Sequence, residues 1–341
     1  MAEKVTLRDV AAAAGVAEST ASRALAGSGQ LSEATRRRII DAADRLGYDT
    51  QGRATVAPPE TKRRRGVIGV VVAALNNSFY PYLVDRLHNE LDDLSFDMVL
   101  IIDEITRDRA GRKLRSLIDT LDGVIVTTAM IDSPMVDFLV ERGVPTVLAI
   151  RSNMRDNTHV VESDNVSAGA EALGHLVALG HRRIGLLMGP ATTSTTFGRL
   201  EGARRVMEKA GISIDASLLF HTEFTHEGGY SGCVQLMRSS DPPTAIFCAN
   251  DVIAIGALDA ARKIGVDVPS ELSIIGVDDI PMASWSMISL TTVRQPIGEI
   301  GSMAAKLVSE AVSRGEALQP RNQIFPTSLL VRATTGPVRG Q

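Results

Sequence analysis

From Val67 onward, short and continuously apolar runs alternate with segments of helix length, and this alternation limits the possible folds more than any other feature. Strands with one solvent-exposed face alternate apolar and polar residues, whereas strands covered on both faces are apolar throughout. The pattern therefore predicts doubly wound parallel sheets of the α/β class, and a span of about 260 residues suits two lobes of about 130 residues each. Helix-length segments such as 165–180 and 196–210 separate the runs. The runs are VIGVVVAAL (67–75), MVLII (98–102), GVIVTT (123–128), PTVLAI (145–150), RIGLLMG (183–189), TAIFCA (244–249) and LSIIGVD (272–278).

The first 48 residues differ from the rest because they combine small side chains with helical spacing. Thr6 and Asp9 have the spacing of a capping box at the start of a helix, and Gly15 is expected to end that helix. The residues expected to face inward from three helices are Val10, Ala13, Ala14, Ala21, Ala24, Leu25, Ile39, Ile40, Ala43 and Leu46, with the third helix running from Ser32 to Gly47. A helix, a short Gly turn and a second helix are typical of the unit that places a helix in the DNA major groove. Spacing alone leaves open an Ala-rich helical hairpin without a DNA role.

Charge is distributed unevenly along the chain, although the net charge is only −4. Residues 1–66 carry 12 Lys and Arg against 8 Asp and Glu, whereas the remainder carries 24 against 32. A small basic segment joined to a large acidic one is typical of a nucleic-acid-binding head on a body that does not bind nucleic acid. Between the two, residues 49–66 contain Pro58-Pro59 and the basic run KRRR (62–65), which predicts a linker.

Composition and motifs indicate a protein that is neither secreted nor catalytic. The opening residues MAEKVTLRDV lack the apolar region of a secretory leader, and no run reaches 18 apolar residues, so we expect a cytoplasmic protein without a membrane partner. Cys233 and Cys248 are expected to be buried free thiols, with a disulfide left open. The sequence has no dinucleotide fingerprint after a strand, no Walker loop, no His-Glu-x-x-His and no Gly-x-Ser-x-Gly. We therefore expect no enzyme, cofactor or metal.

Adjacent Asp278 and Asp279 are the best candidates for a catalytic carboxylate pair. Neighbours at a strand end point in opposite directions and cannot converge on one bond. We therefore expect their side chains to diverge and Asp279 to cap the following turn.

Ordered motifs run along nearly the whole chain: VTLRDVAAAAGVAESTASRALAGSG and LSEATRRRIIDAADRLGY, then GVIGVVV, DGVIV, GVPTVL, SDNVSAGAEAL, LGHRRIGLLMGP, PTAIFCANDVIAIGAL, VPSELSIIGVDDIPMASW and LTTVRQPIGEIG. Together they resemble the lactose/galactose-repressor (LacI/GalR) family of bacterial transcription regulators. The resemblance implies a three-helix helix-turn-helix head and a periplasmic-binding-protein-like core of two doubly wound parallel-sheet lobes. The implied ranges are 1–48 for the head, 49–66 for the hinge, 67–163 with 294–324 for the first lobe, and 164–293 with 325–341 for the second lobe.

The resemblance also implies a function. A homodimer would bind a pseudo-palindromic operator in double-stranded DNA and repress carbohydrate-utilisation genes until a sugar-like effector binds between the lobes. Two alternatives remain open: a regulator of the same fold that responds to a nucleoside or another non-sugar effector, and a sugar-binding protein of the transport type.

In the family, the first residues of the second helix read base edges, and these positions carry Glu18 and Ser19, with Arg23 one turn further. Glu accepts a hydrogen bond from cytosine N4, and Arg binds guanine or a phosphate. Expected phosphate contacts, which set register but not sequence, are Thr6, Ser22, Arg36 and Arg37. Arg38 is expected to face solvent. Ala17 stands where the family usually has Ser, so the second helix lacks its common N-cap at a cost of about 1 kcal/mol.

The hinge departs further from the family pattern. The family has a hinge helix whose Leu enters the minor groove, whereas this chain reads DTQGRATVAPP, with Arg53, Val56 and Ala57 at the hinge positions. Pro58-Pro59 directly after them argues against a full hinge helix. We therefore expect operator affinity to depend steeply on salt and weakly on the central base pairs. Whether KRRR contacts the DNA backbone or is a solvated linker stays open.

The resemblance places the ligands for sugar hydroxyl groups at Arg199, Asn250, Asp278 and Gln295, at the carboxyl ends of strands where open parallel sheets bind ligands. The aromatic residues expected near the pocket are Phe79, Phe224 and Trp285.

One departure concerns the run LAIR, because the family often has Asp directly before Arg151, where this chain has Ile150. Replacing a carboxylate by an aliphatic group favours a less hydroxylated or differently oriented ligand. It also leaves Arg151 able to meet an anionic group.

Overall fold

The structure is a computed structural model that describes residues 6–25, 31–46, 48, 65–102, 111–314 and 319–338. It divides into two compact units, a head unit up to Arg64 and a main unit from Arg65 onward. The expected linker, 49–66, is two residues too long, because Arg65 and Gly66 belong to the main unit. The Asp122 carboxylate accepts hydrogen bonds from their backbone N–H groups, at 2.8 Å from Arg65 and 2.6 Å from Gly66. The hinge positions Arg53, Val56 and Ala57 lie outside the described residues.

In the head unit, three helices enclose a small core. They are α1 (Leu7–Ala13), α2 (Glu18–Leu25) and α3 (Glu33–Leu46). The capping box at α1 is confirmed: the Asp9 carboxylate accepts hydrogen bonds from the Thr6 backbone N–H (2.8 Å) and hydroxyl (2.6 Å). Gly15 follows α1 with φ of +63°, a conformation that favours glycine. The buried residues are Val10, Ala11, Ala14, Ala21, Ala24, Ile39, Ala42 and Ala43.

Three expectations for the head core were wrong. Ala13 is exposed while Ala11 is buried, and Ile40 and Leu46 are about two-fifths exposed. Adjacent residues on a helix point about 100° apart, so the face that buries Ile39 turns Ile40 toward solvent.

From the sequence we expected Arg38 to face solvent, but its side chain also makes a hydrogen bond within the head unit. Its Nε donates a 3.0 Å hydrogen bond to the carbonyl oxygen of Ala14, the residue that caps the carboxyl end of α1. Carbonyl groups at a helix end lack partners within the helix, so Arg38 stabilises the junction between α1 and α3.

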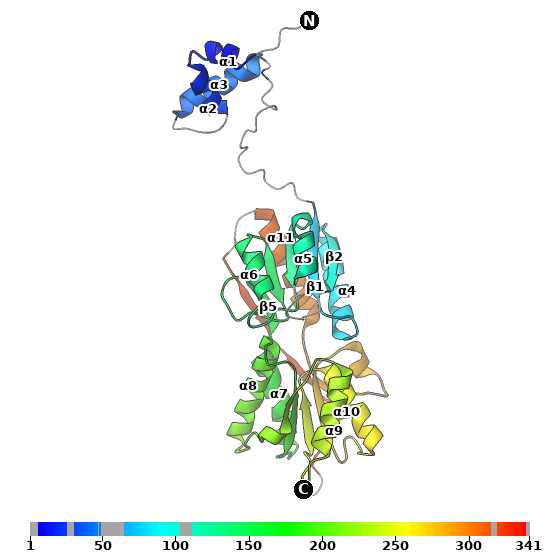
Figure 1. Ribbon diagram of the computed structural model, residues 1–341. Helices are drawn as coiled ribbons and strands as arrows, with labels where there is room; N and C mark the ends of the chain where they lie inside the picture. The colour runs from blue at the N-terminus through cyan, green and yellow to red at the C-terminus, as the bar shows by residue number, and fades with distance from the viewer. Residues whose placement is uncertain are drawn as a thin grey trace. The chain divides into compact units, whose positions relative to one another are not determined.

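The described part of the main unit contains two six-stranded sheets, one in each lobe (Figure 1). The first has the order β11-β5-β4-β3-β1-β2 and is parallel throughout, with strands β1 (Val67–Val72), β2 (Asp97–Ile102), β3 (Gly123–Val126), β4 (Thr146–Ala149), β5 (His159–Ser163) and β11 (Asn322–Phe325). The second has the order β12-β10-β9-β8-β6-β7, with strands β6 (Ile184–Met188), β7 (Leu219–His221), β8 (Ala245–Cys248), β9 (Ser273–Asp278), β10 (Thr291–Arg294) and β12 (Ser328–Leu330). In this sheet β12 runs antiparallel to β10. The predicted doubly wound α/β class is confirmed.

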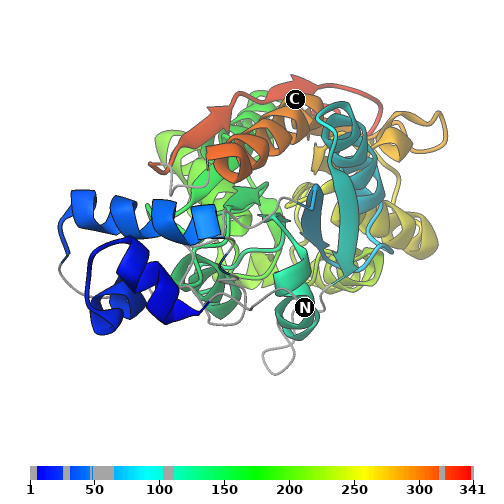
Figure 2. The same ribbon diagram turned by 90° about the horizontal axis from the view of Figure 1, so that it is seen from above.

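Helices cover both faces of the first sheet, which explains its continuously apolar strands (Figures 1 and 2). On β1, Val71 packs in the cluster under α5 (Arg112–Leu117) and α6 (Pro134–Glu141). Its neighbours Val70 and Val72 pack in the cluster that includes α4 (Phe79–Asp93) and α11 (Ile297–Arg314). Successive residues of a strand point to opposite faces, so a strand covered on both sides needs apolar residues at every position.

The second lobe carries two closely packed helix pairs, α7 (Asn165–Ala178) with α8 (Ser194–Lys209) and α9 (His226–Met237) with α10 (Asp251–Ile264). The helix segments expected at 165–180 and 196–210 correspond to α7 and α8. Cys233 and Cys248 are both buried and unpaired in this lobe, as predicted.

The chain crosses between the lobes after β5, after β10 and after β11. The expected lobe ranges need two corrections here. Arg294 ends β10 and belongs to the second sheet, while Phe325 ends β11 and belongs to the first. Both differences arise because each strand continues to the crossover itself.

Candidate functional site

A cleft lies between the two lobes, at the carboxyl ends of their strands. Its walls gather every predicted ligand-binding residue except Trp285. The residues that line it are Asn77, Phe79, Tyr80, Ile150 and Arg151 from the first lobe, and Thr195, Arg199, Phe224, Asn250, Asp278 and Gln295 from the second lobe and the crossover after β10.

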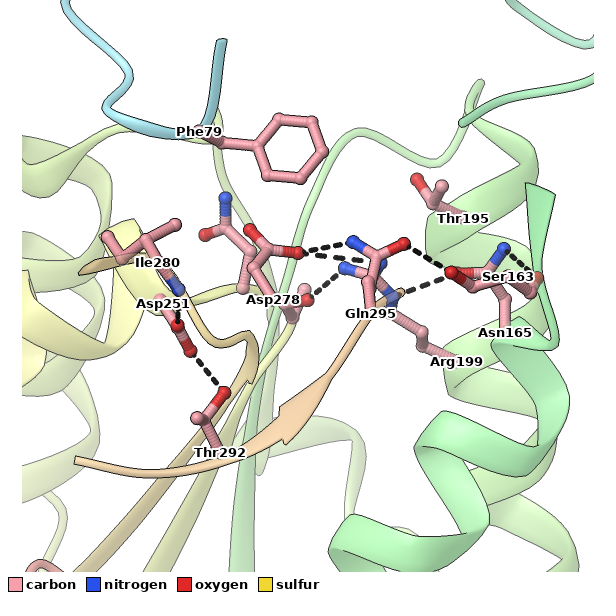
Figure 3. A network of polar contacts seen from close by, with 12 residues as sticks. Phe79, Ser163, Asn165, Thr195, Arg199, Asp251, Asp278, Ile280, Thr292 and Gln295 are labelled. Carbon is pink, nitrogen blue, oxygen red and sulfur yellow. Dashed lines mark hydrogen bonds and ion pairs between the residues drawn. The ribbon is translucent and has the colours of Figure 1, made fainter. Parts of the chain in front are cut away.

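Arg199 and Asp278 form the buried ionic centre of this cleft (Figure 3). Their side chains are 3% and 4% exposed, and 3.7 Å separates the guanidinium from the carboxylate. The guanidinium also donates to Asn165 Oδ1 (3.0 Å) and to the Ala249 carbonyl oxygen (2.5 Å). A buried charge requires such partners because desolvation is costly. Arg199 therefore has its hydrogen-bonding partners within the protein.

Close packing of α7 against α8 brings Arg199 to this position. A β-carbon at Gly169 on α7 would overlap the backbone carbonyl of Arg199 on α8. Gly169 therefore permits a helix approach that a larger residue would prevent.

A chain of hydrogen bonds connects Asp278 to the first lobe (Figure 3). Gln295 Nε2 donates to Asp278 Oδ1 (2.6 Å), and Gln295 Oε1 accepts from the Ser163 hydroxyl at the end of β5 (2.8 Å). Ser163 and Gln295 lie on different crossovers, so this chain joins two of the segments that connect the lobes.

Asp278 and Asp279 diverge, as predicted, and both have positive φ angles, 136° and 58°. Non-glycine residues rarely adopt such conformations, which concentrate at functional sites. The expected role of Asp279 was wrong: instead of capping a turn, its carboxylate pairs with Arg294 (2.8 Å) and Arg332 (2.6 Å). These ion pairs hold Asp279 away from the cleft while Asp278 points into it.

Behind Asp278 lies Asp251, which the sequence analysis did not select. Its carboxylate accepts hydrogen bonds from the Thr292 hydroxyl (2.5 Å) and the Ile280 backbone N–H (3.0 Å). Burial, reinforced by the nearby Asp278 carboxylate, raises the pKa of Asp251 to about 8. Burial also raises the pKa of Asp278, to about 6, against the opposing attraction of Arg199. At neutral pH Asp251 is therefore mainly protonated, and Asp278 is the ionised member of the pair.

Asn250 has a local structural role besides its place in the cleft. Its side-chain oxygen caps α10 by accepting a 2.9 Å hydrogen bond from the Ile253 backbone N–H. Its amide nitrogen leaves donors for a ligand.

The first-lobe side of the cleft is mainly apolar. Phe79 and Tyr80 stack edge to face with 5.7 Å between ring centroids. Asn77 links the start of α4 to the second lobe. Its side-chain amide donates to the Phe224 carbonyl (3.0 Å), and its side-chain oxygen accepts from the Phe79 backbone N–H (3.0 Å). The apolar faces suit the C–H surface of a sugar.

Ile150 and Arg151 complete this side. Ile150 has a φ of +72°, which is strained for a β-branched residue. The Arg151 guanidinium lies over the Phe224 ring, 5.0 Å from its centroid. The wall therefore presents an aliphatic group and a cation, at the point where the resemblance implies that Asp is often found.

The cleft is narrow in this conformation. Its cavity is about 30 Å³. We expect a sugar to bind with the lining side chains or the lobes further apart. A larger hollow of about 550 Å³ borders α10 in the second lobe, but it contains none of the predicted residues.

Trp285 was wrongly expected near the cleft. It is 56% exposed and lies outside the cleft lining. Its backbone carbonyl accepts hydrogen bonds from Ile288 (2.8 Å) and Ser289 (2.7 Å), forming a surface turn. The resemblance, on which the expectation rested, did not indicate this turn.

Several other residues line the cleft without having been predicted from the sequence. Asn77 and Tyr80 flank the predicted Phe79, and Thr195 follows the strand run that ends at Gly189. Their positions after apolar runs were the available signal, since strand ends meet at one edge of a parallel sheet. Asn165 stands in the motif SDNVSAGAEAL and supports Arg199 from behind.

The head unit carries the predicted DNA-binding residues on or near its surface. Glu18, Ser19 and Arg23 are exposed on α2, and Arg23 Nε donates to the Ser19 carbonyl (3.2 Å). The predicted phosphate contacts divide into exposed Thr6 and Arg37 and half-buried Ser22 and Arg36.

Within the described ranges, no group of three His, Cys, Asp or Glu side chains is placed to hold a metal ion. None of the described helices is long and apolar enough to span a membrane.

Comparisons with known proteins agree with the fold and with the head. Residues 6–51 match the family model for bacterial regulatory proteins of the lacI family, and residues 173–335 match a periplasmic binding protein-like domain. The chain is 32% identical to the HTH-type transcriptional regulator DegA of Bacillus subtilis (strain 168), over 98% of this chain and 99% of DegA. Among solved structures, the CelR–cellobiose complex is 30% identical with a TM-score of 0.73, covering 97% of this chain and 99% of that one. The lac repressor dimer bound to operator and the anti-inducer ONPF is 26% identical with a TM-score of 0.71, covering 98% and 100%.

Proposed function

Because this chain belongs to the lacI family of bacterial regulatory proteins, we propose that it represses carbohydrate-utilisation genes and is released from DNA by a sugar-like effector. It is a DNA-binding transcription regulator, as its relatives are. We assign it no catalytic reaction. It acts as a homodimer on a pseudo-palindromic operator, in the cytoplasm, where it meets chromosomal DNA.

The observation that carries the effector proposal is the buried polar network between the lobes. Arg199, Asp278 and Gln295 offer donors and acceptors in fixed directions opposite the aromatic edge of Phe79. Such a combination suits a polyol, whose hydroxyl groups need directed partners while its C–H faces need apolar contact. Asn250, Phe224, Ile150 and Arg151 complete the proposed binding set. The similarity to the CelR–cellobiose complex supports the same choice.

Hydrogen bonds across the cleft give the effector a means of control. Ile131 N–H donates to the Thr192 carbonyl (2.9 Å), and Ser152 N–H donates to the Ser194 hydroxyl (2.9 Å). Since we expect the cavity to widen when a sugar binds, binding changes which of these contacts form. A ligand shifts a conformational equilibrium by its difference in affinity for the two states, and operator and effector must affect each other reciprocally.

On the DNA side, Glu18, Ser19 and Arg23 read bases, whereas Thr6, Ser22, Arg36 and Arg37 contact phosphates. The exposed face of α2 supports this assignment, as does the similarity to the operator-bound lac repressor dimer. We include Arg53, Val56 and Ala57 in the DNA-contacting set as hinge positions, and we expect operator affinity to depend steeply on salt.

The test is a thermal-shift screen of the full-length protein against mono-, di- and oligosaccharides, sugar acids, phosphosugars and nucleosides, followed by operator release measured by fluorescence anisotropy. A ligand at 100 times its Kd adds about 2.7 kcal/mol of stability. We expect a saccharide to raise the Tm and to release operator.

Two variants separate the proposed roles. Asp278→Asn should lose the ligand-induced shift and keep operator binding, whereas Arg23→Ala should lose operator binding and keep the shift. A hit confined to nucleosides would favour the non-sugar regulator. A saccharide that shifts the Tm without changing operator affinity would contradict the proposed control.

A further inference from the structure

We propose that the effector carries an anionic group, a carboxylate or a phosphate, which Arg151 binds together with the amino end of α8. This inference rests on the proposed function in one respect, namely that the cleft between the lobes is the effector site.

The charge of the cleft favours an anionic ligand. Its charged lining residues in the described chain are Arg151, Arg199 and Asp278, two cations against one carboxylate. Asp251 behind them adds little negative charge at neutral pH, because burial raises its pKa to about 8. A buried charge without a counter-charge is costly, so the cleft favours a ligand that supplies a negative group.

The two arginines differ in their partners. Arg199 is engaged by Asn165, the Ala249 carbonyl and Asp278. Arg151 is only 7% exposed, yet within the described residues its guanidinium has no hydrogen bond or ion pair. The guanidinium lies over the Phe224 ring and is attracted at longer range by the Asp278 carboxylate. A planar guanidinium held against a ring leaves its donors directed for bidentate binding of a carboxylate or phosphate.

The first turn of α8 contributes Thr195 to the same cleft (Figure 3). The amino end of this 16-residue helix carries partial positive charge, and the Thr193 hydroxyl at its N-cap accepts a hydrogen bond from the Thr196 N–H. The Ser152 N–H donates to the Ser194 hydroxyl at 2.9 Å, so the residue next to Arg151 is attached to the start of this helix. Arg151 and the amino end of α8 therefore approach the cleft together.

Ile150 lies directly before Arg151 and supplies no carboxylate to pair with its guanidinium, so a counter-charge must come from the ligand. Ile150 stands where the family pattern often has an aspartate, lines the cleft and is 5% exposed. An aliphatic side chain there provides no carboxylate for Arg151, whereas an aspartate would add a negative charge beside it.

Isothermal titration of the full-length protein with matched probes tests the inference. The pairs are glucose with glucuronate, galactose with galacturonate, and glucose with glucose 6-phosphate. Citrate and inorganic phosphate are included as non-sugar anions. We expect one acid or phosphate to bind at least tenfold more tightly than its neutral partner, and the carboxylate and phosphate pairs distinguish the two groups.

Arg151→Gln should weaken binding of that anionic probe at least tenfold and leave the neutral partner unaffected. Arg151→Lys keeps the charge without the bidentate geometry and should lie between the two. The matched control is Arg155→Gln, which removes an exposed guanidinium paired with Asp132 and Asp137 and should leave binding unchanged. The Tm of each variant without ligand verifies its fold.

The outcomes separate the two proposals. Neutral sugars that bind as tightly as their acids, with no effect of Arg151→Gln, would overturn this inference and leave the proposed function intact. An Arg151-dependent anion that is not a sugar would support the inference and contradict the sugar effector. Failure of every anionic probe to bind, while a neutral saccharide from the thermal-shift screen binds, would overturn this inference alone.

Discussion

The two sides of the cleft are built in different ways. On the second-lobe side, Arg199, Asp278 and Gln295 satisfy one another through hydrogen bonds and an ion pair. On the first-lobe side, Phe79 and Ile150 are apolar, and Arg151 rests on Phe224 without a polar partner in the described chain. One side makes most of its polar contacts within the protein, whereas the other holds a cation that a ligand can pair.

This difference suggests a division of roles. A fully satisfied buried network is rigid and holds its donors and acceptors in place before a ligand arrives. An unpaired cation adds little to folding, but it gains substantially when a counter-charge binds. The second-lobe side would then orient a ligand, while the first-lobe side would select which ligand is accepted.

The same substitution on each side tests this contrast most strongly. Arg199→Met leaves Asp278 buried without its cation and should destabilise the protein by about 3–5 kcal/mol. Arg151→Met removes mainly a contact with an aromatic ring and should cost about 1 kcal/mol or less. Urea unfolding followed by circular dichroism measures both.

Equal losses for the two variants would show that the sides are not energetically different. A larger loss for Arg151→Met would mean that Arg151 has a structural partner in the protein, and the proposed anion site would lose its main support.

The pH dependence of stability examines the carboxyl pair behind the network. Burial raises the pKa of Asp251 from 3.8 to about 8, so the folded protein retains this proton between those values while the unfolded chain releases it. Stability must therefore fall as pH rises through that window. Asp251→Asn removes this contribution, so between pH 5 and 7 the variant should lose stability less steeply, by up to about 1.4 kcal/mol per pH unit.

Asp215→Asn is a suitable control, because hydrogen bonds from Ser217 lower the pKa of Asp215. Its titration falls below the window, and the slope between pH 5 and 7 should match the wild type. An unchanged slope in Asp251→Asn would show that Asp251 is ionised in the folded protein, and the charge argument for the cleft would weaken.

Much of the scaffold could be predicted from the sequence because its signal is repeated and local. Apolar residues at every position of β1 and β8 indicate cover on both faces, and the helices between them follow from length. Strands such as β11, with the pattern NQIF, could not be found this way. That strand is short, half exposed and lies at an edge of its sheet, so its residues need not be apolar.

The site was less predictable, because its key features depend on contacts between distant segments. The motif GVDD indicates a strand end, but not that Asp279 pairs with Arg332 while Asp278 turns into the cleft. Likewise, no local preference places Ile150 at positive φ, since β-branched residues avoid that region. Trp285 shows the converse error: the resemblance placed it near the pocket, but it lies outside the cleft lining.

The smallest expected effect concerns the link between the sides. Ser163→Ala removes the hydroxyl that donates to Gln295 Oε1 at 2.8 Å, and one lost buried hydrogen bond should cost about 1 kcal/mol. Ser116→Ala, which removes an exposed hydroxyl bonded to the Lys113 carbonyl, is the control and should change stability by less than about 0.5 kcal/mol. Urea unfolding of both variants provides the comparison. If Ser163→Ala cost as much as Arg199→Met, the network would depend on the first lobe as a whole, and the second-lobe side could not be regarded as complete by itself.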